Sequence, residues 1–250
     1  MEVHHHPDLH HRPKKWKEYL LEFLMIFLAV TLGFFAENIR ESLVEQNKEK
    51  QFILSMIEDL KSDTIIFRQN IDNWYGNTIQ IDTLVALLTN ADIKNKSGRI
   101  YNLERVATRN ITLPFYNSRT FEQMKNSGSL TLIRKAAIAN AITNYYNSIR
   151  RLDEFRALFS GTHEQLIKDE YLIFDSYTLF QTKQKRPYKL LTITGNPSFT
   201  KFDTKDFNQY LARLNRYYTL NLVILDWVAN YYLPATKKLL SLLQTNYGNE

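Results

Sequence analysis

The most distinctive pattern in the chain is an apolar run close to its start. Residues 19–36 read YLLEFLMIFLAVTLGFFA and contain one charged side chain, Glu22. A helix of this length extends about 27 Å, at ~1.5 Å per residue, close to the ~30 Å hydrocarbon core of a bilayer. Trp16 and Tyr19 lie where interfacial aromatic residues are expected. The pattern therefore predicts a transmembrane helix at residues 19–36.

The charges on the two sides of this run predict its orientation. Four cations precede it, and the charges that follow it have both signs; the cations are Arg12, Lys14, Lys15 and Lys17. Because cytoplasmic flanks are enriched in Lys and Arg, the N-terminus is expected in the cytoplasm. We therefore expect a single-pass protein of the bacterial cytoplasmic membrane, with a tail at residues 1–18, a span at 19–36 and an extracytoplasmic helical domain at 37–250.

Three alternatives compete with this interpretation. A cleaved signal peptide also has basic residues before its apolar run, but Ala29-Val30-Thr31 is a poor cleavage site. A buried helix of a soluble protein is rarely apolar on every face with cations on one side only. A second span at residues 217–233 would contain Asn221, Asp226 and Asn230, which instead indicate a polar stripe on an amphipathic bundle helix.

One face of the predicted span carries the candidate site. At 100° per residue, five side chains share this face: Glu22, Ile26, Ala29, Gly33 and Glu37. The Ala29–Gly33 pair would let two helix backbones approach closely, which predicts a homo-oligomer formed through the span. Two other interpretations of Glu22 are a carboxyl at the membrane boundary, near Trp16 and the lysines, and a group linked to ion movement.

The rest of the chain follows a helical period. Between about residues 45 and 90, apolar side chains recur at steps of three or four, and no helix breaker lies between Ala36 and Phe52. The span is therefore predicted to continue as one stalk helix, bent at Gly76. Two short helices are expected at residues 100–108 and 119–126, the second ended by Gly128.

Two more long helices are predicted downstream. One covers about residues 132–182, with a break at Gly161, and the other covers about 205–245, with Asp203 or Thr204 as N-cap and a kink at Pro234. Residues 188–194 could form a strand, but without a partner. The predicted fold is all-α: one N-terminal transmembrane helix followed by an elongated antiparallel bundle of three long and two short helices. Eight aromatic residues are predicted to lie in or near its core: Trp74, Tyr145, Tyr146, Phe155, Tyr171, Phe174, Tyr217 and Tyr218.

Composition and motifs exclude several kinds of chemistry. The chain has no cysteine, so it cannot form a disulfide, a thiolate metal site or a Cys nucleophile. Its seven glycines are scattered singly, unlike those of phosphate-binding loops, and none of the common hydrolase, zinc-protease or calcium-loop motifs is present. We expect no catalytic residue, no cofactor and no nucleic-acid partner.

Histidines are concentrated at the N-terminus. Five of the six lie in the first eleven residues, and the sixth is His163. A His-rich tract can bind a divalent metal, but no carboxylate or Cys cluster completes a site, so we interpret it as a weakly basic cytoplasmic tail without a defined metal site. His163 is expected to be a surface or packing residue.

Two blocks of sequence resemble a known family. Residues 14–41 (KKWKEYLLEFLMIFLAVTLGFFAENIRE) and 49–63 (EKQFILSMIEDLKSD) are similar to the N-terminus of an uncharacterised family of small bacterial membrane proteins, and residues 121–149 resemble its second block. The resemblance implies a single-span anchor with a helical outer domain of unknown function, and it assigns no activity. It would place five residues in the family motif: Glu22, Gly33, Glu37, Asn38 and Arg40.

Together these patterns predict a membrane-anchored, non-enzymatic interaction, sensory or structural module of the cell envelope. Its partners would be the lipid bilayer, a second copy of the chain through the span, and an unidentified protein. The alternative is a membrane-tethered binding protein or enzyme acting on envelope lipid or glycan. In that case residues 183–200 and 111–116 would form the cleft.

Overall fold

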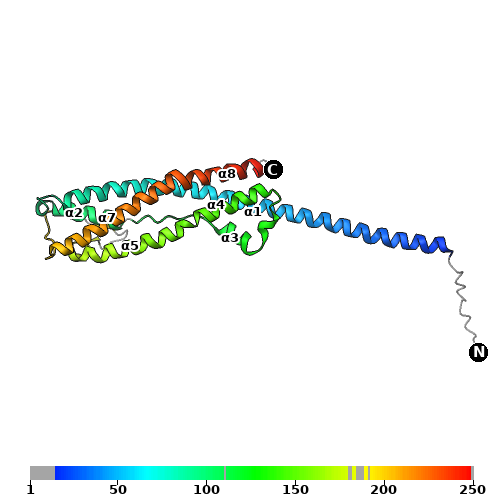
Figure 1. Cartoon of the computed structure of the whole chain (residues 1–250), viewed down its shortest axis with the longest axis horizontal. Helices are drawn as coiled ribbons and strands as arrows, with labels where there is room; N and C mark the ends of the chain where they lie inside the picture. Colours follow the sequence, from blue (N-terminus) through cyan, green and yellow to red (C-terminus); the bar gives the residue numbers. More distant parts are fainter. Residues whose placement is uncertain (1–14, 110, 180–181, 184–188, 191, 249–250) are drawn as a thin grey trace, which may run out of the picture. The chain divides into compact units, whose positions relative to one another are not determined.

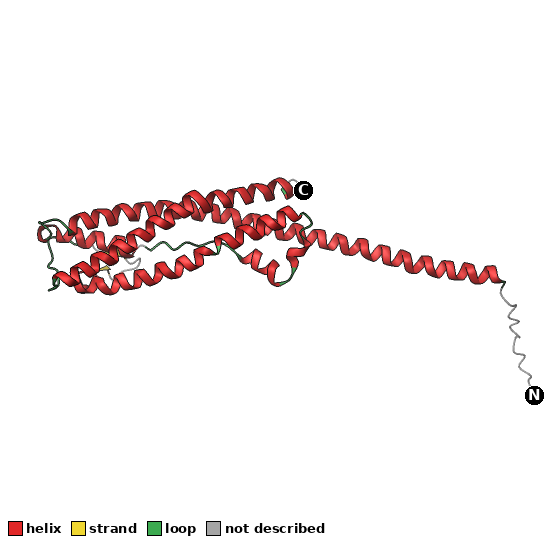
Figure 2. Cartoon of the chain, viewed as in Figure 1, coloured by secondary structure: helices red, strands yellow, loops and turns green. Residues whose placement is uncertain are grey.

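The computed structural model describes residues 15–109, 111–179, 182–183, 189–190 and 192–248. These residues are almost entirely helical, which confirms the predicted all-α class (Figure 2). The chain divides into two units, residues 1–50 and residues 51–250, so fourteen residues, 37–50, lie between the predicted end of the span and the start of the second unit. The tail at residues 1–14 lies outside the described residues.

Helix α1 is one uninterrupted helix from Trp16 to Leu88, which confirms that no break separates the predicted span from the stalk. Its buried residues inside the bundle include Ile53, Ile57, Leu60, Phe67 and Trp74. These residues recur at the helical period, so one face of α1 faces the core. Gly76 lies inside the helix and does not end it.

The remaining helices follow in order: α2 (Ser97–Arg109), α3 (Arg119–Asn126), α4 (Ala136–Ile149), α5 (Arg151–Ile173), the single turn α6 (Ser176–Leu179), α7 (Thr204–Trp227) and α8 (Leu233–Tyr247). Two short 3-10 helices, Lys94–Lys96 and Ser129–Leu132, precede α2 and α4. Gly128 adopts a φ of 71° just after α3, as predicted for a residue that ends a helix in the left-handed region.

The predicted helix over residues 132–182 is divided into α4, α5 and the single turn α6, and its first break lies at Arg150 rather than at Gly161. At this junction the N–H of Arg150 donates to the Tyr146 carbonyl at 3.2 Å, and the Arg150 carbonyl accepts from the Asp153 N–H at 3.0 Å. Gly161 lies inside α5, between the buried residues Phe159 and Leu166. Burial of these neighbours outweighs the cost of one helical glycine, about 1 kcal/mol.

The bundle contains three long rods: α1, α4 followed by α5, and α7 followed by α8. Only the α7–α8 rod runs antiparallel to the other two. The extended segment after α2 runs back along α1, because Trp74 Nε1 donates to the Thr112 carbonyl at 2.8 Å and the Asn117 N–H donates to Asp63 Oδ1 at 2.8 Å. This return lets the α4–α5 rod run in the same direction as α1 within the bundle. The α7–α8 rod runs in the opposite direction to both (Figure 1).

The predicted cap of the last helical segment is confirmed, and the backbone is irregular near Pro234, where a kink was predicted. Asp203 caps α7, because its side chain accepts a hydrogen bond from the Asp206 N–H at 2.8 Å and Asp206 reciprocates. A π-helical segment, Val228–Tyr232, separates α7 from α8 directly before Pro234. Proline has no N–H to donate to the preceding turn, and a locally widened helix absorbs this loss.

The expected strand near residue 190 does have a partner. Residues Thr182–Lys183 (β1) pair antiparallel with residues Lys189–Leu190 (β2). Two residues on each side make a hairpin too small to stand alone, so it is an appendage of the helical fold.

The predicted aromatic core is confirmed for most of its members. Trp74, Phe174 and Tyr217 are almost completely buried, whereas Tyr171 is 44% exposed. Asn221, predicted on a polar stripe with Asp226 and Asn230, is instead buried and donates to the Tyr217 carbonyl at 2.9 Å, while its Oδ1 accepts from Asn77 of α1. Asn221 therefore makes a buried polar contact between α7 and α1 instead of belonging to an exposed polar stripe.

Candidate functional site

The apolar part of α1 is uncovered in this structure. Its twelve large apolar side chains from Leu20 to Phe35 are each between 45% and 68% exposed. Among the described helices, α1 is the one with a window long and apolar enough to cross a membrane, and none of that window is buried. Contiguous apolar surface of this extent marks a site that contacts a membrane or another protein.

The predicted stripe lies on this exposed helix. Ile26 is exposed, and a Cβ added to Gly33 would meet nothing within 4 Å. Glu37 Oε1 lies 2.5 Å from Arg40 Nη2, one turn further along the same helix. Packing within the chain therefore does not require glycine at position 33, and any requirement for a small residue there would come from another molecule.

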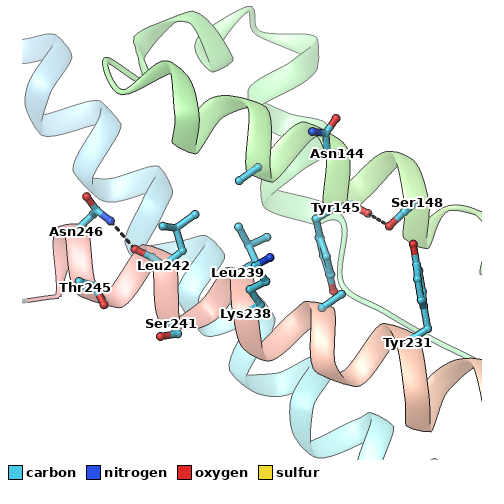
Figure 3. Close-up of a pocket in the computed structure, with 12 residues that line it drawn as sticks. Asn144, Tyr145, Ser148, Tyr231, Lys238, Leu239, Ser241, Leu242, Thr245 and Asn246 are labelled. Carbon is cyan, nitrogen blue, oxygen red and sulfur yellow. Dashed lines mark hydrogen bonds between the residues drawn. The ribbon is translucent and has the colours of Figure 1, made fainter.

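An open groove of about 590 Å³ lies between α4 and α8. Figure 3 shows Leu239 and Leu242 projecting from α8 toward α4, while Tyr145 projects from α4 toward α8. Lys238 contributes a cation to the lining, and Asn144 and Ser148 line it from α4. A mostly apolar groove of this size can accommodate a small apolar ligand or an apolar chain of about the size of a drug molecule.

The segments predicted to form a cleft are packed on the bundle instead. Within residues 192–200, the Thr200 N–H donates to the Ile173 carbonyl at 3.1 Å, and the Ser198 carbonyl accepts from the Tyr101 hydroxyl at 2.9 Å. Residues 184–188 and 191 lie outside the described residues. Tyr116, at the end of the other segment, lines a smaller pocket of about 190 Å³ together with Phe121 and Tyr146.

A pair of carboxyl groups is sealed inside the bundle. Glu104 of α2 and Glu170 of α5 are both completely buried, and each has one oxygen, Oε1, without a hydrogen-bond partner. The other oxygens are bonded: Glu104 accepts from the Tyr210 hydroxyl, and Glu170 lies 2.5 Å from Arg109 Nη2. Burial raises the pKa of Glu104, and the charge of Glu170 raises it further. Burial also raises the pKa of Glu170, to about 7, against the opposing effect of Arg109.

A second buried carboxyl lies on α1. Asp63 Oδ1 accepts hydrogen bonds from both the main-chain and side-chain nitrogens of Asn117, at 2.8 and 2.6 Å, while Oδ2 is buried without a partner. Burial raises the pKa of Asp63 to about 7, despite the opposing hydrogen bonds from Asn117. Asp59, one turn earlier, accepts from the Thr120 hydroxyl at 2.5 Å. These groups fix the returning segment to α1.

These buried carboxyls were not among the predicted site residues, although the sequence carries a signal for one of them. Glu104 lies on the same face of its helix as Ile100, Ala107 and Thr108, all of which are buried. An acidic residue within an apolar helical stripe indicates a buried, partnered group. His163 is a packing residue, as predicted: its Nε2 lies 2.6 Å from the Thr108 carbonyl and its ring lies against Tyr217.

The described residues contain no group of three or more His, Asp or Glu side chains arranged to hold a metal ion. No family model, no curated protein and no solved structure matches the chain. The resemblance of the N-terminal block to a family of small membrane proteins therefore stays a prediction, and the functional argument rests on the chain's own surfaces.

Proposed function

We propose that this protein is a membrane-anchored, non-enzymatic interaction module of the bacterial envelope. Residues 19–36 cross the cytoplasmic membrane, the N-terminus lies in the cytoplasm, and the bundle at residues 51–250 lies outside. The observation that supports this proposal most strongly is the uncovered apolar surface of α1 between Leu20 and Phe35.

The energetics favour a bilayer as the environment of this surface. Removing one fully exposed large apolar side chain from water contributes about 1.5–3 kcal/mol. The twelve side chains are 45–68% exposed, so covering all of them corresponds to roughly 10–20 kcal/mol. This is comparable to the typical folding free energy of a whole domain, about 5–15 kcal/mol. Exposure of this segment to water would therefore cost as much free energy as folding of a domain releases.

The continuity of α1 supports a mechanical role. The same helix that holds the proposed span also supplies core residues of the bundle, such as Trp74 and Ile81. A movement of the bundle can therefore be transmitted through α1 to the proposed span, as in other rigid-body transitions. We propose that a partner chain receives the signal on the cytoplasmic side.

Carbonate extraction of the full-length chain tests the anchor. We expect the protein to stay in the membrane pellet, and a double variant, Phe27→Asp with Val30→Asp, to be released, because each charge at mid-span costs about 3 kcal/mol. Leu54→Asp is the matched control, since Leu54 is an exposed apolar residue of α1 in the bundle unit. Recovery of the unmodified chain in the aqueous fraction would contradict the proposal.

The groove between α4 and α8 favours a second candidate function, the binding of an envelope lipid. Its apolar lining fits an acyl chain, and Lys238 fits an anionic head group. A fluorescent long-chain fatty acid is a suitable probe for the detergent-solubilised protein. We expect Leu242→Arg to weaken binding at least about tenfold and Leu222→Arg, an exposed residue outside the groove lining, to leave it unchanged. Equal affinities would count against a ligand in this groove.

A further inference from the structure

The groove between α4 and α8 adjoins a second cavity. Figure 3 shows Tyr231 projecting toward Ser148 of α4, at the end of the groove opposite Asn246. Tyr231 also lines a pocket of about 430 Å³, which we call the junction pocket, together with five further residues: Arg151, Asp226, Trp227, Asn230 and Tyr232. The Tyr232 hydroxyl lies 3.5 Å from the carbonyl oxygen of Ser148, a residue of the groove lining. The two cavities are therefore neighbours that share Tyr231 as a wall.

The same two helix faces continue from the groove into the junction pocket. On the α4–α5 rod, lining residues follow one another at steps of three or four: Ala141, Tyr145, Ser148 and Arg151. Arg150, between the two helices, keeps helical backbone angles, with φ −56° and ψ −21°. On the α7–α8 rod, lining residues follow at steps of four: Leu239, Ala235, Tyr231 and Trp227. Because such steps keep side chains on one face, a single elongated ligand can lie along both cavities.

The junction pocket differs from the groove because it carries charges of both signs. Arg151 supplies a cation and Asp226 a carboxylate, and within the described residues these two side chains form no ion pair with each other. Asn230 Nδ2 donates to Asp226 Oδ1 at 2.7 Å, which orients the carboxylate and leaves Oδ2 for a ligand. Two opposite charges that do not pair with each other suit a ligand that carries both an anion and a cation.

The pocket also presents aromatic rings, and the bundle holds them in place. Trp227 lies 5.7 Å from the ring of Phe155, and Tyr231 meets Tyr232 edge-on at 5.4 Å. Both exposed rings belong to the π-helical segment that joins α7 to α8 or directly precede it, and such segments are frequent at functional sites. The face of a Trp or Tyr ring attracts a cation. An ammonium group therefore fits between these rings and Asp226.

Arg151 suits the negative group of the same ligand. Its guanidinium is a planar fork that can bind a phosphate through two hydrogen bonds. Burial raises the pKa of the Tyr232 hydroxyl and the charge of Arg151 opposes this effect, so the guanidinium lies near the Tyr232 wall of the pocket. Lys238, in the groove, attracts any anionic lipid, whereas the carboxylate and rings of the junction pocket favour a head group that is also positively charged.

We propose that the groove and the junction pocket together bind one phospholipid whose head group carries a phosphate and an ammonium. The acyl chain lies in the groove, the phosphate contacts Arg151, and the ammonium lies among Asp226, Trp227 and Tyr231. This inference rests on the proposed binding of an envelope lipid and names the head group of that lipid. A purely anionic head group would meet the like charge of Asp226, and a fatty acid would leave the junction pocket unused.

Three probes with the same fluorescent acyl chain test the parts of this site separately: a fatty acid, a lysophosphatidic acid and a lysophosphatidylethanolamine. Each is titrated into the detergent-solubilised full-length protein. We expect lysophosphatidylethanolamine to bind at least about tenfold more tightly than the other two probes, because it alone engages both Arg151 and Asp226. Equal affinities for the two phospholipid probes would overturn the inference, since the ammonium would then contribute nothing.

Two variants locate the head group. Asp226→Asn should weaken the binding of lysophosphatidylethanolamine at least about fivefold, with no loss for the other probes. Arg151→Gln should weaken both phosphate-containing probes by a similar factor and leave the fatty acid unchanged. Asp72→Asn and Arg216→Gln are the matched controls, since both residues are exposed and lie outside the two linings. Affinities in the two variants equal to those of the controls would overturn the inference.

The fatty acid separates this inference from the proposed lipid binding. If the fatty acid binds and lysophosphatidylethanolamine binds no more tightly, the head-group assignment fails alone; if no probe binds, the proposed lipid binding fails as well. Glycerophosphoethanolamine, which is the head group without an acyl chain, serves as a competitor. We expect it to displace the lysolipid only at a large excess. Displacement at an equal concentration would identify the ligand as a soluble zwitterion and overturn the inference that it is a lipid.

Discussion

At the scale of single residues, the bundle retains ionisable groups where apolar side chains would be expected. Asp63, Glu104 and Glu170 are completely buried, and each has one oxygen without a hydrogen-bond partner. The protonated forms of such groups are favoured, because burial penalises their charge. The stability of the bundle should therefore depend on pH through these three carboxyls.

The pH dependence of unfolding tests the role of Asp63. Its pKa is about 7 in the folded protein against an ordinary value of about 3.8, so between these values the folded state holds a proton that the unfolded state has released. The contribution of Asp63 to the free energy of unfolding should therefore fall as pH rises from about 4 to 7, by up to about 1.4 kcal/mol per unit, and then level off. Denaturant titrations of the detergent-solubilised full-length protein would measure this slope.

Asp63→Asn is expected to remove this contribution and to leave a smaller slope from Glu104 and Glu170, whose raised pKa values act in the same direction. Glu58→Gln serves as the control, because Glu58 is an exposed residue paired with Lys61. An unchanged slope in Asp63→Asn, or a rise of stability with pH in the unmodified protein, would contradict the assignment.

Two glycines of similar appearance in the sequence have opposite roles. A Cβ on Gly98 would lie 2.0 Å from the carbonyl oxygen of Gly195, whereas a Cβ on Gly161 would meet nothing within 4 Å. We expect Gly98→Ala to destabilise the protein by about 3 kcal/mol through overpacking, and Gly161→Ala to stabilise it by about 0.5–1 kcal/mol through helix propensity. Thermal unfolding of the two variants measures both effects, and a stabilising Gly98→Ala would show that the segment near Gly195 is not packed against α2.

At the scale of elements, local signals predicted helix ends better than helix junctions. Asp203 at the start of α7, Gly128 after α3 and the irregularity before Pro234 are each determined by the chemistry of one residue, and each was predictable. The junction at Arg150 carries no such signal, because neither glycine nor proline lies next to it in the sequence. The break expected at Gly161 was wrong because tertiary burial outweighed local propensity.

The cap of α7 allows a direct measurement at this scale. Asp203→Ala should cost about 1 kcal/mol of stability, because the Asp206 N–H loses its acceptor at the helix start. Lys205→Ala is a suitable control, since it changes an exposed residue of the same turn. A chemical denaturation midpoint in Asp203→Ala equal to that of the control would show that the capping box contributes little.

At the scale of the whole molecule, the all-α class and the long first helix were predictable because both depend on the period of apolar residues. The relative direction of the rods was not, because it depends on the extended return of residues 111–117, which is fixed by long-range contacts such as that of Asn117 with Asp63. The candidate stripe was identified from the sequence, whereas the groove between α4 and α8 needed the packed bundle.

The account depends above all on α1 crossing a bilayer with the bundle outside. Labelling with a membrane-impermeant maleimide in intact cells tests this most directly, because the natural chain contains no thiol. We expect Asn208→Cys, an exposed position of α7, to be labelled in intact cells, and Leu9→Cys, before the span, to be labelled only after the cells are broken. Labelling of Leu9→Cys in intact cells with protection of Asn208→Cys, or protection of both positions until lysis, would contradict the proposed topology.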